Sequence, residues 1–208
     1  MVITLRKGKE NVAIYINDRE FTNFVHRYVA TPLIYDEIGW TEYQTDPIEL
    51  KHKDINLGID YEMLDDSNNI IRIQERFRES SYNNYNDITI RYQRVHNPDP
   101  SRKQSEYFKI KADYFVYGIT NGPKSNYEEM VNGFLKIAIV DINVLKDKFD
   151  NGFIKIGNSK KSFIKDGILY AGYNVNCDYS SEFIVLDLIH LHQLFDNDGI
   201  VYFQEGFY

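Results

Sequence analysis

Carboxylate, amide and guanidinium side chains occur close together between residues 58 and 78. Gly58-Ile59-Asp60 begins this segment, and Gln74, Glu75 and Arg76 lie near its end. Carboxylate and amide oxygens are ligands for Mg²⁺, which prefers oxygen atoms in an octahedral arrangement. Such an ion polarises a phosphate and makes a bound water easier to deprotonate, and a nearby cation stabilises negative charge in the transition state. The residue types therefore predict metal-assisted hydrolysis of a phosphodiester.

The order Gln74-Glu75-Arg76 leaves two arrangements of this site open. Side chains alternate across a strand, so Gln74 and Arg76 share one face, while Glu75 shares the other face with Phe77. If the first face is active, the ligand beside Asp60 is a neutral amide, and the cation is an arginine that hardly acts as a base. If Glu75 is the ligand, the residue two positions later is Phe77, which has no catalytic group.

The segment 58–78 resembles the core hairpin of the restriction-endonuclease-like, or PD-(D/E)XK, nucleases. That pattern has an Asp on one strand and an acidic residue or Gln, then any residue, then Lys on the next. The subgroup Gly-Ile-Asp…Ile-Gln-x-Lys is the most similar. The resemblance implies a Mg²⁺-dependent DNA endonuclease with Asp60 and Glu75 as metal ligands and Gln74 and Arg76 in the catalytic set. Arg76 stands where the family has Lys.

Other charged residues are candidates for the same site. Lys109 or Lys111 is expected to supply the ammonium group that the segment 58–78 lacks, and Asp113 is a third carboxylate. Glu20 lies on the first predicted helix, where the nucleases that the chain resembles often place an acidic residue. The alternative for Glu20 is a helix-capping role.

Five of the nine arginines lie within residues 72–94. Arginine binds phosphate through a rigid, bidentate guanidinium group. This concentration predicts a local nucleic-acid-binding surface formed by Arg72, Arg78, Arg91 and Arg94, with Arg76 at the catalytic site. The alternative is that the arginines pair on a solvated sheet face, as surface charges commonly do, with Glu62, Glu75, Glu79 and Asp87.

The composition excludes several classes of protein. The net charge is −7 and the pI is near 5.3, which argues against non-specific coating of nucleic acid, although an acidic enzyme can still have a basic groove. No apolar run is long enough to span a membrane, and the first residues lack the apolar core of a signal peptide. Cys177 is the only cysteine, so no internal disulfide is expected. A cytoplasmic setting follows as an expectation.

The chain is expected to form a single domain, 1–208, of the α/β class: a mixed sheet of about five or more strands flanked by helices. Aromatic residues make up 15% of the sequence and favour strands. Strands are predicted at 54–64, 70–77, 88–92 and 107–119, with a turn at 65–69. A polar loop is predicted at 79–87 and a mobile loop at 96–105.

Helix boundaries can also be predicted. Asn17 and Glu20 have the spacing of a capping box, and an apolar face follows that Pro32 should end or kink, formed by Phe21, Phe24, Val25, Tyr28 and Val29. Asp141 and Asp187 are placed to begin two later helices, and Gly152 and Gly199 to end them. His190 and His192 would then point in different directions and not bind one metal.

The residues together predict a metal-dependent DNA nuclease of a kind that would suit a phage or mobile element. The alternative is a non-enzymatic binding or inhibitor protein with a degenerate nuclease-like fold, supported by the departures at Gln74, Glu75 and Arg76. A structural protein that assembles through its sheet, including a homodimer, is a third class. DNA is the expected partner in the first case and a protein in the second.

Overall fold

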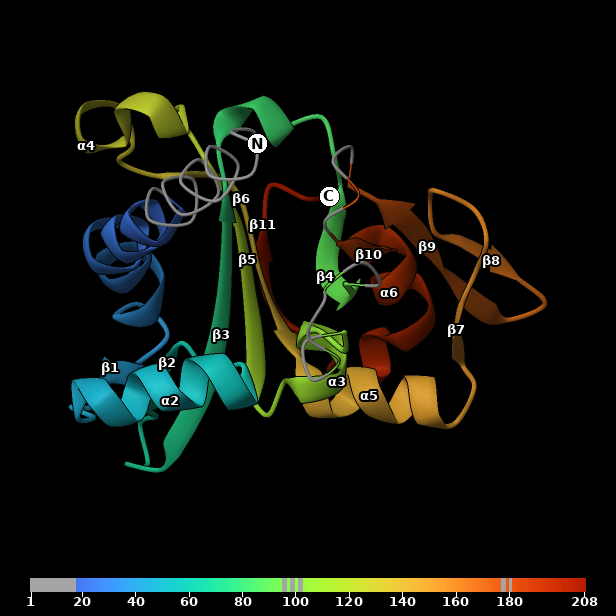
Figure 1. Cartoon of the computed structure of the whole chain (residues 1–208), viewed down its shortest axis with the longest axis horizontal. Coiled ribbons are helices and arrows are strands. Elements are labelled where there is room, and N and C mark those ends of the chain that lie inside the picture. The colour runs from blue at the N-terminus through green and yellow to red at the C-terminus, as the bar shows by residue number, and fades with distance from the viewer. Residues whose placement is uncertain (1–17, 95–96, 98–99, 101–102, 177–178, 180) are drawn as a thin grey trace, which may run out of the picture.

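A computed structural model describes residues 18–94, 97, 100, 103–176, 179 and 181–208. This part of the chain contains two mixed sheets with helices around them (Figure 1). The expected α/β class is therefore confirmed. The expected single sheet is replaced by two, of six and five strands. Asn17, Pro98 and Cys177 lie outside the described residues.

The six-stranded sheet has the order β1-β2-β3-β5-β6-β11. Strands β3 and β5 pair in parallel, and the other neighbours are antiparallel. The bounds are Thr41–Glu42 for β1, Tyr61–Leu64 for β2, Ile70–Arg78 for β3, Tyr114–Thr120 for β5, Phe134–Asp141 for β6 and Val201–Glu205 for β11.

The five-stranded sheet has the order β4-β10-β9-β7, and β8 also pairs with β9. Strand β4 lies at one edge of this sheet, on the side of β3 (Figure 1). The predicted strands 70–77 and 88–92 therefore belong to different sheets. The bounds are Asp87–Gln93 for β4, Ile154–Ile156 for β7, Phe163–Lys165 for β8, Ile168–Val175 for β9 and Glu182–Asp187 for β10.

The helices pack around the two sheets (Figure 1), and two of them contribute buried residues to the apolar core between the sheets. The α-helices are α2 (Pro47–Leu57), α3 (Glu106–Lys109), α4 (Tyr127–Met130), α5 (Ile142–Asp150) and α6 (Leu188–Phe195). The 3₁₀ turns are η2 (Ser80–Tyr82), η4 (Lys124–Asn126) and η5 (Asp196–Asp198). None of the helices in the described residues is long and apolar enough to cross a membrane.

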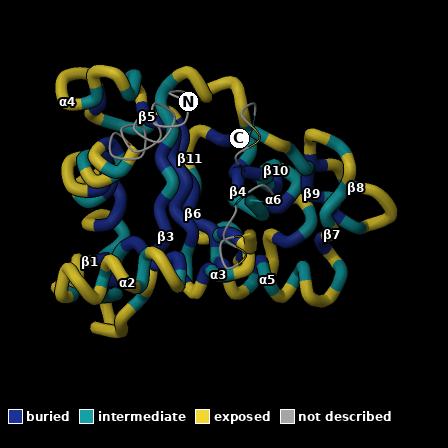
Figure 2. The backbone as a smooth tube through the Cα atoms, in the orientation of Figure 1, coloured by how far each residue is buried: buried dark blue, intermediate teal, exposed yellow. Residues whose placement is uncertain are grey.

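Two apolar cores hold these layers together. The larger lies between the sheets and includes Phe115 and Val140 from one sheet and Ile88 and Ile184 from the other. The second packs the opposite face of the six-stranded sheet against the helical segment 18–35. Strands β3, β5 and β6 are accordingly mostly buried, whereas α2 is largely exposed (Figure 2).

The two predicted strand-to-helix corners are confirmed. The Asp141 carboxylate accepts hydrogen bonds from the first amides of α5, and the Asp187 carboxylate accepts one from the amide of Ile189 in α6. Gly152 and Gly199 follow α5 and α6–η5 with φ angles of 76° and 70°, a left-handed conformation that glycine adopts without steric cost.

The first helix departs from the prediction at Pro32. Residues 18–25 are α-helical, and the backbone then continues as a π-helix, η1, over His26–Tyr35 with Pro32 inside it. Of the two outcomes predicted for Pro32, an end or a kink, the end is wrong, because the helical backbone continues to Tyr35. Beyond the change of period the apolar face shifts, so Tyr28 is 60% exposed while Val29 is buried.

The predicted strand 54–64 is wrong over its first part. Helix α2 extends to Leu57, and β2 begins only at Tyr61. The Asp46 carboxylate caps α2 ahead of Pro47, a residue favoured at the first helical position. The antiparallel hairpin remains, since residues 61–64 of β2 pair with residues 70–73 of β3 across the predicted turn.

The predicted strand 107–119 is also shorter than expected. Residues 106–109 form α3, and β5 occupies Tyr114–Thr120. Strand β5 lies centrally in its sheet, between β3 and β6. The predicted loop 79–87 contains the short turn η2, and most of the predicted mobile loop 96–105 falls on or beside residues outside the described ranges.

Candidate active site in the cleft between the sheets

A cleft of about 460 Å³ lies between the two sheets. Its lining comes from the first helix, α2, strands β3 and β4, the turn η2, helix α3, and the residues Asn176, Ser181 and Phe183. Polar and charged side chains predominate, among them Asp60, Gln74, Arg76, Arg78 and Arg91. The folded chain thus brings most of the predicted site residues to one cavity.

Asp60 is placed by the turn between α2 and β2. Gly58 ends α2 with a φ angle of 58°, and a Cβ atom there would lie 2.6 Å from Gln74 Oε1. Only glycine fits this close approach without displacing a neighbour. The Asp60 amide donates to Ile73 O at 2.8 Å, and its carboxylate accepts the Glu75 amide at 2.8 Å. The carboxylate therefore takes part in the pairing of β2 with β3.

The Asp60 carboxylate is buried at the edge of the cleft. Its side chain is 7% exposed, and Arg19 Nη1 lies 3.2 Å from one oxygen. Arg19 also bonds Asp54 at 2.9 Å. Burial and the nearby Asp54 carboxylate raise the pKa of Asp60 from its ordinary 3.8 to about 7. A carboxyl group whose ionisation is this unfavourable gains from a bound cation.

Gln74 and Arg76 share the cleft face of β3. Gln74 Nε2 donates to Glu106 Oε1 at 3.0 Å, while Gln74 Oε1 is buried without a hydrogen-bond partner. Arg76 Nη1 donates to Thr89 O at 2.8 Å and lies 3.3 Å from Glu106 Oε2. Burial lowers the pKa of Arg76 to about 10. Arg76 thus joins β3 to the open edge of β4.

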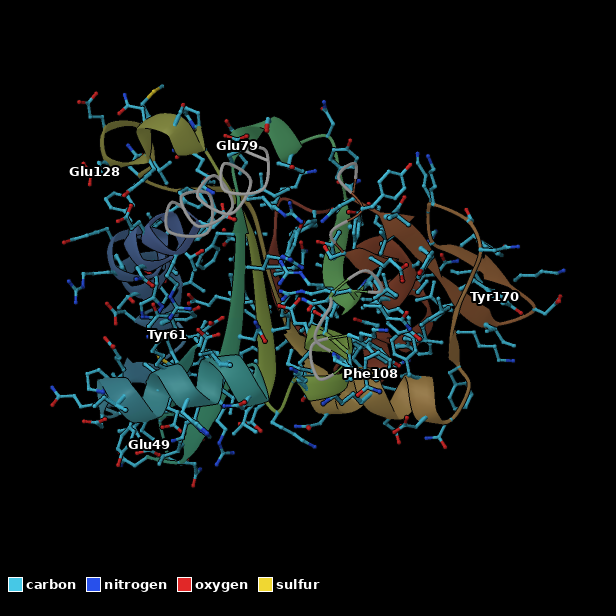
Figure 3. The ribbon with its side chains drawn as sticks, viewed as in Figure 1. Glu49, Tyr61, Glu79, Phe108, Glu128 and Tyr170 are labelled. Carbon is cyan, nitrogen blue, oxygen red and sulfur yellow. The ribbon has the colours of Figure 1, made fainter. Side chains whose placement is uncertain are left out.

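Glu75 points to the opposite face, into the second core. Its Oε1 lies 2.7 Å from His26 Nδ1 and accepts the Tyr35 hydroxyl at 2.5 Å, and the carboxylate has no exposed surface. Burial by itself lowers the pKa of His26, but the Glu75 carboxylate outweighs it and raises that pKa. Burial, followed by Glu75, raises the pKa of Tyr35. The His26 ring also stacks on the ring of Tyr61, with 3.5 Å between the ring centroids. Tyr61 is labelled in Figure 3.

The two arrangements that the sequence left open are therefore distinct places in the fold. Asp60 shares the cleft with Gln74 and Arg76, whereas the Glu75 side chain is enclosed with His26 and Tyr35. Glu75 meets Asp60 through its backbone amide. The structure brings the carboxylate of Asp60 and the side chain of Glu75 to opposite sides of one strand.

The donors in the cleft fit a hard cation. Asp60 offers a buried carboxylate and Gln74 an amide oxygen with no protein partner, and Mg²⁺ takes few protein oxygens and keeps several waters. Among the described residues, His, Cys, Asp and Glu form no group of three or more that could hold a metal. Asp60 and Gln74 are the cleft residues that could hold a Mg²⁺ ion, although Arg19 and the Glu75 amide already donate to the two Asp60 oxygens.

The predicted arginine surface is divided by the fold. Arg78 and Arg91 line the cleft with Arg76. Arg94 lines an adjacent cavity. Arg72 lies outside both, 45% exposed, with Glu62 at 3.8 Å and Asp113 at 3.7 Å. Pairing on a solvated face, the alternative for all five arginines, describes Arg72 within the part of the chain that the structure describes.

Other predicted residues fall in several places. Lys109 lines the adjacent cavity, whereas Lys111 and Asp113 line neither, and the Asp113 carboxylate accepts the Arg72 amide. Glu20 is exposed on the first helix. His190 and His192 lie on α6 and bond different partners, Ser162 and Asp196 respectively.

Several residues of the site were not found from the sequence. Arg19, Asp54 and Glu106 line the cleft, and His26 and Tyr35 enclose Glu75. Glu106 fell at the edge of a predicted strand, and His26 and Tyr35 bracket the unexpected π-helix. An unusual helix of this type is often a sign of a functional segment, but its period is invisible in the pattern of apolar residues.

No family model, curated protein or solved structure matches the chain. What the cleft does must therefore be inferred from its own residues.

Proposed function

We propose that this protein is a Mg²⁺-dependent DNA endonuclease that hydrolyses phosphodiester bonds in the cleft between the sheets. One observation carries the proposal: the buried Asp60 carboxylate and the unpartnered Gln74 amide oxygen line the same cavity as Arg78 and Arg91. Oxygen ligands beside guanidinium groups suit a metal ion and a phosphate side by side.

Each of these residues has a defined task. Asp60 and Gln74 would hold the Mg²⁺, which when bound supplies phosphate polarisation and a more acidic water. Arg78 and Arg91 bind the phosphate oxygens and stabilise the negative charge that grows in the transition state. Arg76, fixed by Thr89 and Glu106, holds β3 and β4 at a constant separation.

A cleavage assay tests the proposal. Purified protein is incubated with supercoiled plasmid and with single-stranded DNA in Mg²⁺, in Mn²⁺ and in EDTA. We expect cleavage with either metal and none with EDTA. Absence of cleavage on both substrates with both metals would overturn the nuclease assignment.

A non-enzymatic binding or inhibitor protein is the second candidate, and a specific observation favours it. Arg19 lies against Asp60, and Arg76 is bound to Thr89 and Glu106. Two of the predicted catalytic residues, Asp60 and Arg76, are therefore already paired within the protein. Isothermal titration with Mg²⁺ separates the candidates. The nuclease binds the ion through Asp60, whereas the binding protein leaves Asp60 paired with Arg19 and shows no titration heat.

A further inference from the structure

A second cavity of about 510 Å³ adjoins the cleft. Four residues line both, so the two cavities lie side by side: Asp54, Gln74, Arg91 and Glu106. The second cavity extends past α3 through Arg94, Ser105 and Lys109. The candidate active site is therefore one part of a longer groove.

Cations occur along the whole of this groove. Arg78 and Lys124 line the first cavity, Arg94 and Lys109 line the second, and Arg91 lines both. The Arg91 guanidinium makes no hydrogen bond to any residue in the described part of the chain. The Glu106 carboxylate between them is bonded to Arg76 and the Arg91 amide. Lys124 is paired with Asp18, so the positive charge that remains available lies at Arg78, Arg91, Arg94 and Lys109, which matches a ligand with repeated phosphates.

The size and walls of the groove favour one nucleic-acid strand. Each cavity has the volume of a site for a small organic ligand, about 300–1,000 Å³, and the groove has a wall on each sheet. Tyr82 and Phe183 line the first cavity. The Tyr82 side chain is 39% exposed, and the guanidinium carbon of Arg78 lies over its ring, 4.9 Å from the ring centroid. Exposed aromatic rings beside cations are the usual platform for unpaired bases.

We propose that this groove binds an extended single strand of nucleic acid, with phosphates on both sides of Asp60. Arg78 and Lys124 contact the backbone on one side, Arg94 and Lys109 contact it on the other, and Arg91 contacts it between them. Tyr82 stacks against a base. The choice of ligand rests on the proposed function, but binding of the strand does not require cleavage.

Fluorescence anisotropy in EDTA measures that binding without turnover. The probes are a short labelled oligothymidylate, the same sequence as a duplex with its complement, and the labelled dinucleotide. Binding is followed over a range of salt concentrations for the wild type, Arg91→Ala, Arg94→Ala and Lys109→Ala. Arg27→Ala is the matched control, because Arg27 is exposed and lines neither cavity. Thermal melting verifies that each variant is folded.

We expect the oligothymidylate to bind more tightly than the duplex or the dinucleotide. Each of the three groove variants should reduce the slope of log binding constant against log salt concentration by about 0.7, the value for one phosphate contact on a single strand. Arg27→Ala should leave this slope unchanged. The proposal that the groove binds a single strand would be overturned by equal binding of dinucleotide and oligomer, by preference for the duplex, by no binding, or by unchanged slopes in the variants. Binding as expected with no metal-dependent cleavage would instead overturn only the nuclease proposal.

Discussion

The two faces of strand β3 place their polar groups in different surroundings, one enclosed in an apolar core and the other along the cleft. On the core face, Glu75 lies between Ile73 and Phe77 and bonds both His26 and Tyr35 with no exposed surface. On the cleft face, Gln74 leaves its amide oxygen without a partner, and Arg78 leaves Nε without one. Both faces belong to the same nine residues.

The difference separates groups that stabilise the fold from groups that remain available to a ligand. A buried carboxylate costs free energy unless it is paired and hydrogen-bonded, and His26 and Tyr35 compensate Glu75 at Oε1, while Oε2 is enclosed without a partner. Gln74 Oε1 and Arg78 Nε also lack a hydrogen-bond partner, but they belong to residues that line the cleft, where a ligand can satisfy them. A carboxylate is therefore not a site residue merely because it is acidic and near the site.

The largest expected effect concerns the cleft face. Asp60→Asn keeps the size of the side chain and an acceptor for the Glu75 amide but removes the charge that would hold Mg²⁺. Cleavage should fall by more than the roughly 10–100-fold typical of residues that only support a ligand. Binding of DNA should stay equal or become slightly tighter, because a negative charge is lost.

The matched control for that variant is Asp166→Asn. Asp166 is exposed on the turn between β8 and β9, and its φ angle of 52° suits asparagine. It should cleave at the wild-type rate. Wild-type cleavage by Asp60→Asn would show that the catalytic assignment is wrong, whatever the fold.

The next effect separates the two faces directly. Glu75→Ala leaves His26 and Tyr35 without their shared acceptor, and the loss of one partner from a buried charged pair costs about 3–5 kcal/mol. Gln74→Ala removes one hydrogen bond to Glu106, worth about 1 kcal/mol. Urea unfolding should therefore show a large loss of stability for the first variant and a small one for the second.

Activity should show the reverse order. Gln74→Ala should greatly reduce cleavage, whereas Glu75→Gln, which preserves the shape of the side chain, should keep most of the activity per folded molecule. If Glu75→Gln abolishes cleavage while Gln74→Ala does not, the metal ligand is on the core face and the comparison is reversed.

The pH dependence of stability is a smaller effect. The pKa of Asp60 is raised from 3.8 to about 7 in the folded protein, so between about pH 4 and 7 the folded chain holds a proton that the unfolded chain releases. The contribution of Asp60 to stability is therefore full below this window and is lost as the pH rises through it. Asp60→Asn lacks this loss, so its melting temperature relative to wild type should increase from pH 5 to pH 8.

Each kcal/mol of that difference corresponds to about 2–4 °C in a chain of this size. A melting-temperature difference that is constant between pH 5 and pH 8 would contradict the raised pKa.

The smallest expected effect is at Arg72. It pairs with Glu62 and Asp113 on an exposed part of β3, outside both cavities, and exposed ion pairs contribute about 0–1 kcal/mol. Arg72→Ala should leave the salt dependence of DNA binding unchanged and alter stability little. A flatter salt slope for Arg72→Ala would extend the binding surface beyond the groove.

The agreement between sequence and structure is uneven for physical reasons. The hairpin 61–78 and the helix starts at Asp141 and Asp187 depend on neighbouring residues, so their patterns are readable. Helix α2 was missed because its apolar residues, such as Ile48 and Ile55, are exposed, and no buried face marks its period. Glu106 was missed for another reason, since its partners Gln74 and Arg76 are about thirty residues away.

The sequence by itself determined the alternation on β3, which places Gln74 with Arg76 and Glu75 with Phe77, because the side-chain period of a strand is a local property. It also determined that Gly58-Ile59-Asp60 leads into the hairpin. Only the tertiary structure decided which face is the cleft. That choice depends on the helical segment 18–35 covering one side of the sheet and β4 facing the other, and such contacts between distant segments leave no period in the sequence.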